Sequence, residues 1–285
     1  FMVASVGIPS FVVTLANVLS FQGILLLLVK EGGSVRITNK PIADLVGERL
    51  TPTQSWIFTG VAVALYGITI GRRWKASSGA MPLGLAIIKF VAVAAGASIA
   101  TMVLNRNRAF ARATAEIRGM PYVVPTVILI ALVLTFVLTR TRYGRHLYAV
   151  GGNAEAARRA GINVKRIRLS AFAICGLVAG LGGIFLASRV NSVDANTGAN
   201  DTLLLAVGAA VIGGTSLFGG RGRVLNAVLG GLVLALIPNG LTLLRKVTIF
   251  GREIDFSSSG VKFICAGLAL LVAASVDALS RKRSA

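Results

Sequence analysis

One short segment carries the pattern of a docking helix. Asn153 is a residue type that caps the amino ends of helices, and Glu155 stands in the first turn, where the helix dipole favours an acid. The Ala-rich run 154–160 follows, and Gly161 is the residue type that ends helices in a left-handed conformation. Because so short a helix is marginal alone, it requires a surface to rest on. That surface is a protein or, as an equally open alternative, lipid headgroups contacted through Arg158 and the basic residues after it.

The other reactive side chains are too few and too scattered for catalysis. The chain has a single histidine, His146, and its two cysteines, Cys175 and Cys265, lie in apolar runs, so no metal site and no disulfide framework are expected. The sequence contains no Ser–His–Asp or paired-carboxylate arrangement and no Gly-x-x-x-x-Gly-Lys-Ser/Thr motif. We therefore expect neither an enzyme nor a cofactor, and the energy for any work must come from another polypeptide or from a gradient.

The composition is that of a membrane protein. Of the 285 residues, 55% are hydrophobic and 14% are charged, and the mean hydropathy is +0.78, which is too apolar for a soluble domain. The formal net charge of +20 is typical of nucleic-acid-binding proteins, but long uncharged runs separate the basic residues here. Nucleic acid is therefore not expected as a partner, and the lipid bilayer is.

Uncharged runs of about 20 residues, the length that crosses about 30 Å of hydrocarbon, predict the membrane spans. Because the apolar residues run continuously and do not alternate, the spans are helices. We therefore expect an all-α, polytopic transmembrane helical bundle of about eight spans. They are Phe1–Val29, Leu50–Gly71, Met81–Leu104, Gly119–Thr139, Leu169–Ser188, Thr202–Gly220, Val224–Leu244 and Ser257–Val276.

Loop charge gives the expected orientation. If both ends lie on one side, the loops of that side hold sixteen Lys and Arg against twelve on the other, which places the carboxyl terminus in the cytoplasm. Eight of the sixteen lie in the single loop 140–168. The chain opens with Phe1 directly inside an apolar run and without a basic flank. We therefore expect one transmembrane domain, 1–285, that lacks amino-terminal spans.

Several short motifs follow one another in a characteristic order. They are Arg142-Tyr-Gly-Arg145, Gly151-Gly-Asn153, Glu155-Ala-Ala157, Gly161-Ile-Asn-Val-Lys165 and Gly213-Gly-Thr-Ser-Leu-Phe-Gly-Gly-Arg-Gly222. This order resembles that of the permease subunits of monosaccharide ABC importers, whose best-known members carry ribose, galactose or xylose, and the xylose-type branch is the most similar. The resemblance runs from about Ile8 through Asp277, and its most specific part is the glycine-rich run at 213–222.

The resemblance implies a permease subunit that translocates a monosaccharide, for instance a pentose such as xylose, across the bacterial cytoplasmic membrane. The implied partners are two ATP-binding cassette subunits, an extracytoplasmic sugar-binding protein and a second permease copy in a homodimer. One departure weakens the substrate assignment, because Asp201-Thr-Leu-Leu-Leu-Ala206 stands where sugar permeases have an acid followed by Leu-Asp-Ala. Loop 140–168 is the implied coupling loop, with ATPase contacts at Asn153, Glu155, Ala156, Ala157, Arg158, Gly161, Ile162 and Asn163.

Candidate pathway residues lie where the spans are interrupted. The glycine run and the sequence Ile237-Pro-Asn-Gly240 are of the kind that breaks or kinks a membrane helix, so we expect a kink or interruption within Val224–Leu244. The alternatives are a helix-end turn for the glycine run, packing for Asn239, and a lysine that reaches the headgroups for Lys89. The candidates for the translocation pathway are Thr215, Ser216, Asn239 and Lys89.

Small residues predict helix contacts. Gly176 and Gly180 form a Gly-x-x-x-Gly face, for which a contact within the chain is favoured over a dimer interface, and Gly213 and Gly214 allow close backbone approach. No carboxylate lies deep in any expected span, which disfavours a proton- or cation-coupled carrier. The predicted function is therefore an ATP-driven importer subunit. The alternatives are a secondary carrier or channel for a small polar solute, and an ABC permease for a nucleoside or a branched-chain amino acid.

Overall fold

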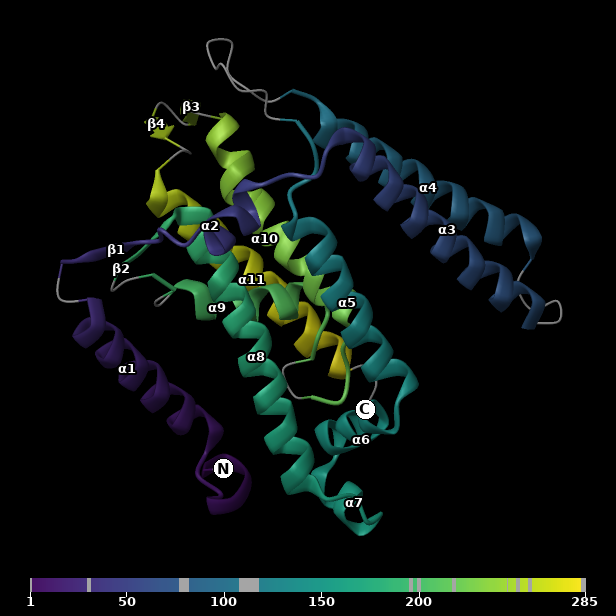
Figure 1. Cartoon of the computed structure of the whole chain (residues 1–285). Helices are drawn as coiled ribbons and strands as arrows, with labels where there is room; N and C mark the ends of the chain where they lie inside the picture. Colours follow the sequence, from purple (N-terminus) through teal and green to yellow (C-terminus); the bar gives the residue numbers. More distant parts are fainter. Residues whose placement is uncertain are drawn as a thin grey trace. The chain divides into compact units, whose positions relative to one another are not determined.

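The computed structural model is mainly helical (Figure 1). It divides into two compact units, and two of the boundaries between them fall inside helices α5 (Val123–Arg140) and α8 (Val164–Val190). The first unit comprises Phe1–Val35, Leu129–Gly183 and Val193–Ala285, and the second comprises Arg36–Ile128 and Ile184–Ser192. The structure describes residues 2–29, 32–76, 82–107, 118–194, 197–198, 201–216, 219–244, 246–249, 252–255 and 258–282.

Six of the described helices are long and apolar enough to cross a membrane. Their large apolar side chains face outward, as helices in contact with lipid require; Leu27 and Leu28 of α1, for example, are 84% and 75% exposed. Each of the six coincides with most of one expected span, so the prediction of an all-α, polytopic membrane protein is confirmed. The six are α1 (Ser10–Val29), α3 (Pro52–Ala76), α4 (Leu83–Asn105), α5, α8 and α10 (Val224–Leu244).

Helix α9 (Asp201–Ile212) corrects one expected span. Thr202–Gly220 was predicted to cross the bilayer, but α9 has 12 residues, which is about 18 Å of helix. The helix ends because Gly214 has a φ of +88° and the amides of Gly214 and Thr215 each donate a 2.8 Å hydrogen bond to a carbonyl in the last turn of α9. This Schellman cap stops the helix before it reaches membrane-crossing length.

The carboxyl-terminal part ends in helix α11 (Ser259–Lys282), which has 24 residues and coincides with most of the expected span Ser257–Val276. Its described apolar stretch, Ser259–Ala273, is shorter than a membrane-crossing length, so the count of eight spans is not confirmed. Before it, β3 (Lys246–Ile249) and β4 (Arg252–Asp255) form an antiparallel hairpin. Other short elements are a π-helical turn (Met2–Val6) and the three-residue strands β1 (Ser34–Arg36) and β2 (Ser192–Asp194).

In the first unit, α9, α10 and α11 pack against one another. A side chain at Gly213 would strike the backbone carbonyl of Asn226 on α10, and one at Gly230 would strike that of Ala209 on α9. These two glycines allow the α9 and α10 backbones to approach closely, which is the role that small residues have between membrane helices.

Helix α10 is unbroken through Pro238. Of the kink or interruption expected within Val224–Leu244, the interruption is not formed. Proline removes one amide donor from the helix, but side chains can supplement the helix hydrogen bonds nearby. The Asn239 amide nitrogen donates a 2.8 Å hydrogen bond to the carbonyl of Ala235, and the Thr242 hydroxyl donates one of 2.5 Å to the carbonyl of Asn239.

The second unit is built on a hairpin of α3 and α4, which lie side by side in Figure 1. The hydroxyl oxygens of Thr59 and Thr101 lie 2.6 Å apart in this interface, where the two residues are only 6% and 1% exposed. A short helix, α2 (Lys40–Gly47), precedes α3. The chain after α2 is tied to the segment before α5 by a 2.8 Å hydrogen bond from the amide of Leu50 to the carbonyl of Met120.

Candidate functional site

The loop between α5 and α8 is helical over most of its length. It contains α6 (Arg142–Gly152) and α7 (Ala154–Arg159), whereas the sequence predicted only the second. Thr141 caps α6, because its hydroxyl oxygen accepts a 3.2 Å hydrogen bond from the amide of Gly144. The apolar residues Tyr143, Leu147 and Val150 recur at helical spacing between the arginines, and this pattern is the sequence signal for α6 that was missed.

Helix α7 is capped at both ends by the predicted residues. The side-chain oxygen of Asn153 accepts 3.0 Å hydrogen bonds from the amides of Glu155 and Ala156. At the other end Gly161 has a φ of +80°, and the amides of Gly161 and Ile162 each donate a 3.0 Å hydrogen bond back into α7. This is a Schellman motif. The expected short helix, its Asn cap and its Gly end are therefore confirmed.

The outer face of α7 is charged, and its inner face is apolar. Glu155 forms ion pairs with Arg158 at 2.9 Å and with Arg159 at 3.3 Å. All three side chains are more than half exposed, so each pair stabilises the helix by no more than about 1 kcal/mol. Ala157 on the opposite side is only 4% exposed. The helix thus presents Glu155 and both arginines outward while Ala157 packs inward.

A short connection joins α7 directly to the long helix α8. Asn163 starts α8 by accepting a 3.0 Å hydrogen bond at its side-chain oxygen from the amide of Arg166. Ile162 beside it is half-buried. Capping hydrogen bonds therefore fix both ends of α7 and the start of α8, and the connection between the two helices is short.

Helix α6 packs against the glycine-rich run through backbone contacts. A Cβ at Gly151 would lie 2.8 Å from the amide nitrogen of Gly220, and a Cβ at Gly219 would lie 2.5 Å from the carbonyl oxygen of Gly151. The Tyr148 hydroxyl donates a 2.7 Å hydrogen bond to the carbonyl of Gly222. The run therefore anchors α6 to the beginning of α10.

Thr215 and Ser216 lie in the turn that leads into this contact and not within a long helix. The amide of Ser216 donates a 3.1 Å hydrogen bond to the carbonyl of Arg221, which closes the turn. This geometry favours the helix-end turn among the interpretations of the run. Residues 217 and 218 of the run lie outside the described residues.

The remaining candidates belong to other parts of the sequence. Asn239 is on α10 in the first unit, and Lys89 is exposed on α4 of the second unit. For Gly176 and Gly180 on α8, no described atom lies within 4 Å of where a Cβ would be. The expected contact of these two glycines within the chain is therefore not formed among the described residues.

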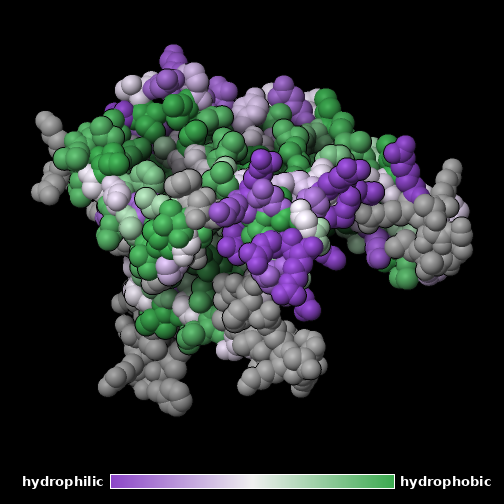
Figure 2. Space-filling model, turned by 90° about the horizontal axis from the view of Figure 1, so that it is seen from below, coloured by the Kyte–Doolittle hydropathy of each residue, from purple (hydrophilic) through white to green (hydrophobic). Residues whose placement is uncertain are grey.

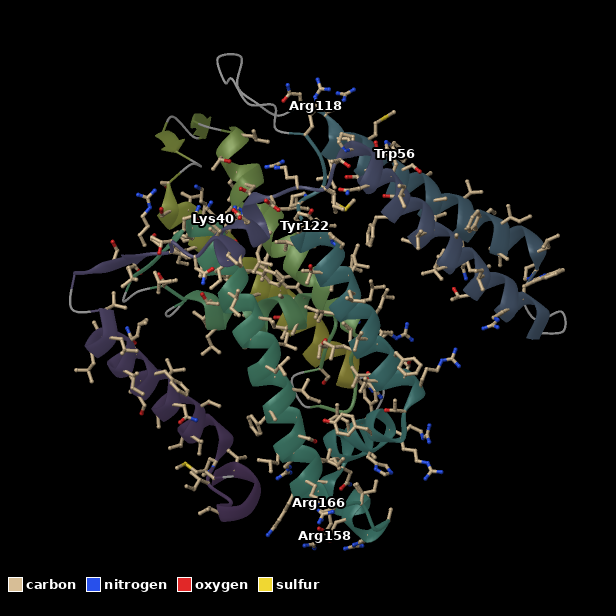
Figure 3. The ribbon with its side chains drawn as sticks, viewed as in Figure 1. Lys40, Trp56, Arg118, Tyr122, Arg158 and Arg166 are labelled. Atoms are coloured by element: carbon tan, nitrogen blue, oxygen red, sulfur yellow. The ribbon has the colours of Figure 1, made fainter. Side chains whose placement is uncertain are left out.

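Hydrophilic side chains gather on the end of the molecule seen in Figure 2, and hydrophobic ones flank them. Arg158 and Arg166 lie at this end in Figure 3, at α7 and at the start of α8. Apart from Arg158 and Arg159, which pair with Glu155, the cations of this surface form no ion pair with another described residue. The exposed basic residues of α6, α7 and the first turns of α8 are Arg142, Arg145, Arg158, Arg159, Lys165, Arg166 and Arg168.

Comparison with known proteins covers nearly the whole chain. Residues 1–257 match the family described as "Branched-chain amino acid transport system / permease component". The chain is 34% identical over 279 residues to the xylose transport system permease protein XylH of Escherichia coli K12, a match that covers 97% of this chain and 66% of XylH. Shorter matches are the D-allose transport system permease protein AlsC (40% over 136 residues, 48% of this chain and 41% of AlsC) and the ribose import permease protein RbsC (42% over 130 residues, 44% and 40%), both of the same organism. No solved structure matches. The predicted resemblance to sugar permeases of the xylose type is confirmed.

Proposed function

Because the chain belongs to the branched-chain amino acid transport system / permease component family, we propose that it is the transmembrane permease subunit of an ATP-driven sugar importer. The chain spans about two thirds of the length of XylH of Escherichia coli K12. The observation that carries the proposal is this match, taken together with a loop helix that is capped at both ends and presents charged side chains outward.

We assign ATPase coupling to α7 and its caps. The outward-facing residues Glu155, Ala156, Arg158 and Gly161 are accessible to a partner, whereas Asn153 and Asn163 fix the helix within the chain. Ala157 and Ile162 seat its inner side. Charges on the exposed rim of an interface affect the choice of partner and the association rate more than the binding affinity. In this segment, therefore, the charged residues would select the partner, and the capping residues would hold the helix in place.

The proposed mechanism is mechanical. Closure of an ATPase dimer on nucleotide pushes α7, and the capped connections pass the movement to α8 and, through α6, to α5. The contact between Gly151 and Gly220 carries the same movement to α10. These helices then alternate the pathway between its two faces, because rigid elements with two packed arrangements transmit displacement over long distances.

The proposal includes an assembly and a location. The partners are two ATP-binding cassette subunits, an extracytoplasmic sugar-binding protein and a second permease copy in a homodimer, in the bacterial cytoplasmic membrane. The carboxyl terminus and loop 140–168 face the cytoplasm. The exposed basic residues of that loop support this orientation, since basic residues accumulate on the cytoplasmic side of membrane proteins.

The proposed substrate is a monosaccharide, with a pentose such as xylose as the first choice. The support is the identity to XylH over 97% of the chain, whereas the matches to the ribose and allose permeases cover less than half of it. The family description names branched-chain amino acids, so L-leucine is the natural control substrate.

The experiment that tests this function is purification in detergent together with the products of neighbouring genes. We expect an ATPase to copurify, and we expect the reconstituted complex to take up D-xylose in a vanadate-sensitive manner. Uptake that collapses with a protonophore and ignores vanadate would instead identify a secondary carrier. Uptake of L-leucine without D-xylose would overturn the sugar assignment.

A further inference from the structure

A pocket of about 490 Å³ lies in the second unit, between α2 and the start of α5. Its volume falls within the range of about 300–1,000 Å³ that is usual for small-molecule sites. Figure 3 labels one residue from each wall, Lys40 on α2 and Tyr122 beside α5. None of its residues belongs to the loop described above. The lining residues are Lys40, Pro41, Asp44, Leu45, Glu48, Tyr122 and Thr126.

Hydrogen bonds hold the wall formed by α2 in place. Ser188, at the end of α8, is only 2% exposed. Its hydroxyl donates a 3.2 Å hydrogen bond to the carbonyl of Ala43 and accepts one of 2.9 Å from the amide of Val46. The amide of Ile37, just before α2, donates a 3.1 Å hydrogen bond to the carbonyl of Asn191. Helix α2 is therefore fixed at its middle and at its approach, although it has only eight residues.

The opposite wall is tied to the same unit. The amide of Leu50 donates to the carbonyl of Met120 at 2.8 Å, and the amide of Met120 donates to the buried Ser55 hydroxyl at 3.2 Å. Tyr122 follows two residues later. Both walls are therefore positioned before any ligand arrives, which lowers the entropic cost of binding.

The polar groups of the pocket are available to a ligand. Within the part of the chain that the structure describes, the side chains of Lys40, Asp44 and Glu48 form no hydrogen bond and no ion pair. Two carboxylates offer acceptors and one ammonium group offers donors. The Tyr122 side chain and Leu45 supply an apolar surface beside them.

This set of groups matches a sugar. A monosaccharide presents hydroxyls that donate to carboxylates and accept from an ammonium group, and it has a C–H face that packs on an aromatic ring. Both charged ends of a zwitterionic amino acid would also find an opposite charge in the pocket, so L-leucine is included in the test as a competitor. The carboxylates and the ammonium group suit a ligand rich in hydroxyls, because each hydroxyl both donates and accepts a hydrogen bond.

We propose that this pocket binds a monosaccharide at the extracytoplasmic entrance of the permease. The segment 30–49 belongs to the loops predicted on that side, opposite loop 140–168. The proposal rests on the proposed function, which supplies a sugar at this face, but it concerns a binding site separate from the coupling loop and from Asn239.

The test is equilibrium binding of radiolabelled D-xylose, D-ribose and D-allose to the full chain in lipid nanodiscs. We expect saturable binding of at least one sugar, weakened about tenfold or more by Asp44→Asn or Glu48→Gln, because each removes a charged hydrogen-bond acceptor. Tyr122→Leu should also weaken binding, and Tyr122→Phe should preserve it, because the ring remains. Asp194→Asn changes a described acid that does not line the pocket and serves as the matched control.

Each outcome decides the proposal. If the wild type binds none of the three sugars, or if the pocket variants bind as tightly as the wild type and unfold at the same temperature, the pocket is not a sugar site. Displacement by L-leucine and not by sugars would make it an amino-acid site. If Asp44→Asn weakens only the docking of the extracytoplasmic binding protein, the pocket is a protein contact. Vanadate-sensitive uptake measured in parallel reports the proposed function separately, so either idea can fail alone.

Discussion

Gly151 on α6 and Gly220 before α10 meet backbone to backbone, so closely that a Cβ at Gly151 would lie 2.8 Å from the amide nitrogen of Gly220. The contact joins two segments far apart in the sequence. It explains why glycines occupy both motifs of the family resemblance, because neither segment has room for a side chain. It also links the proposed coupling loop to a long apolar helix without passing through α8.

Substitution of Gly151 by Ala tests this contact. We expect the free energy of unfolding to fall by about 1–3 kcal/mol, since the added methyl meets backbone that cannot rotate away. Gly152→Ala is the matched control on the same helix, because its Cβ would lie 4.0 Å from the nearest atom, the Cα of Gly220. Thermal unfolding in detergent measures both. Equal unfolding temperatures for the two variants would mean that the close contact is absent.

The cap of α7 gives a second prediction. Asn153→Ala removes the acceptor for the amides of Glu155 and Ala156 and should destabilise the helix by about 0.5–2 kcal/mol. Amide hydrogen exchange at those two residues should accelerate. Asn153→Asp keeps a capping oxygen and should exchange like the wild type. Unchanged exchange in Asn153→Ala would contradict the cap.

The hydroxyl pair between α3 and α4 gives a third prediction. Thr101→Val should cost about 0.6 kcal/mol, the average for such bonds between membrane helices. The cost stays small because the Thr59 hydroxyl keeps its 2.9 Å bond to the carbonyl of Ser55. A double-mutant cycle of Thr59→Val and Thr101→Val measures the coupling. Strictly additive effects would show that the 2.6 Å pair contributes nothing.

Asn239, like Lys89, is a pathway candidate that is exposed on a long helix. In a background with Cys175 and Cys265 replaced by Ser, we expect Asn239→Cys to react with a membrane-impermeant thiol reagent in at least one transport state. Val233→Cys, on another face of α10 and 42% exposed, should stay unreactive because lipid covers it. An Asn239→Cys thiol that no aqueous reagent reaches in any state removes the pathway role.

Local chemistry could be predicted from the sequence. The ends of α7 depend on residues within one or two turns, so Asn153 and Gly161 were sufficient to place them. The positions of the six long apolar helices could also be predicted, because the length of an uncharged run is a local property of the sequence. Helix α9 was misjudged because hydropathy continues past Gly214, where the backbone turns; the Schellman cap depends on conformation and not on polarity.

Contacts between distant segments could not be predicted. Nothing in either sequence segment shows that Gly151 meets Gly220, since each glycine alone is compatible with many neighbours. Likewise, the sequence shows only three loop charges at Lys40, Asp44 and Glu48. Their place in a pocket opposite Tyr122 depends on the hydrogen bonds by which Ser188 holds α2, and Ser188 is far away in the sequence. Helix α6 had a readable apolar pattern, but its arginines made the segment resemble a loop.

The most direct test of coupling is the ratio of ATP hydrolysed to sugar taken up in proteoliposomes. We expect Glu155→Lys and Gly161→Trp to insert normally and hydrolyse ATP while uptake falls about tenfold or more, because both place a mismatched group on the docking surface. Glu155→Gln, which removes the charge without reversing it, should lose less. If uptake and hydrolysis by Glu155→Lys and Gly161→Trp match the wild type, α7 is not the coupling element.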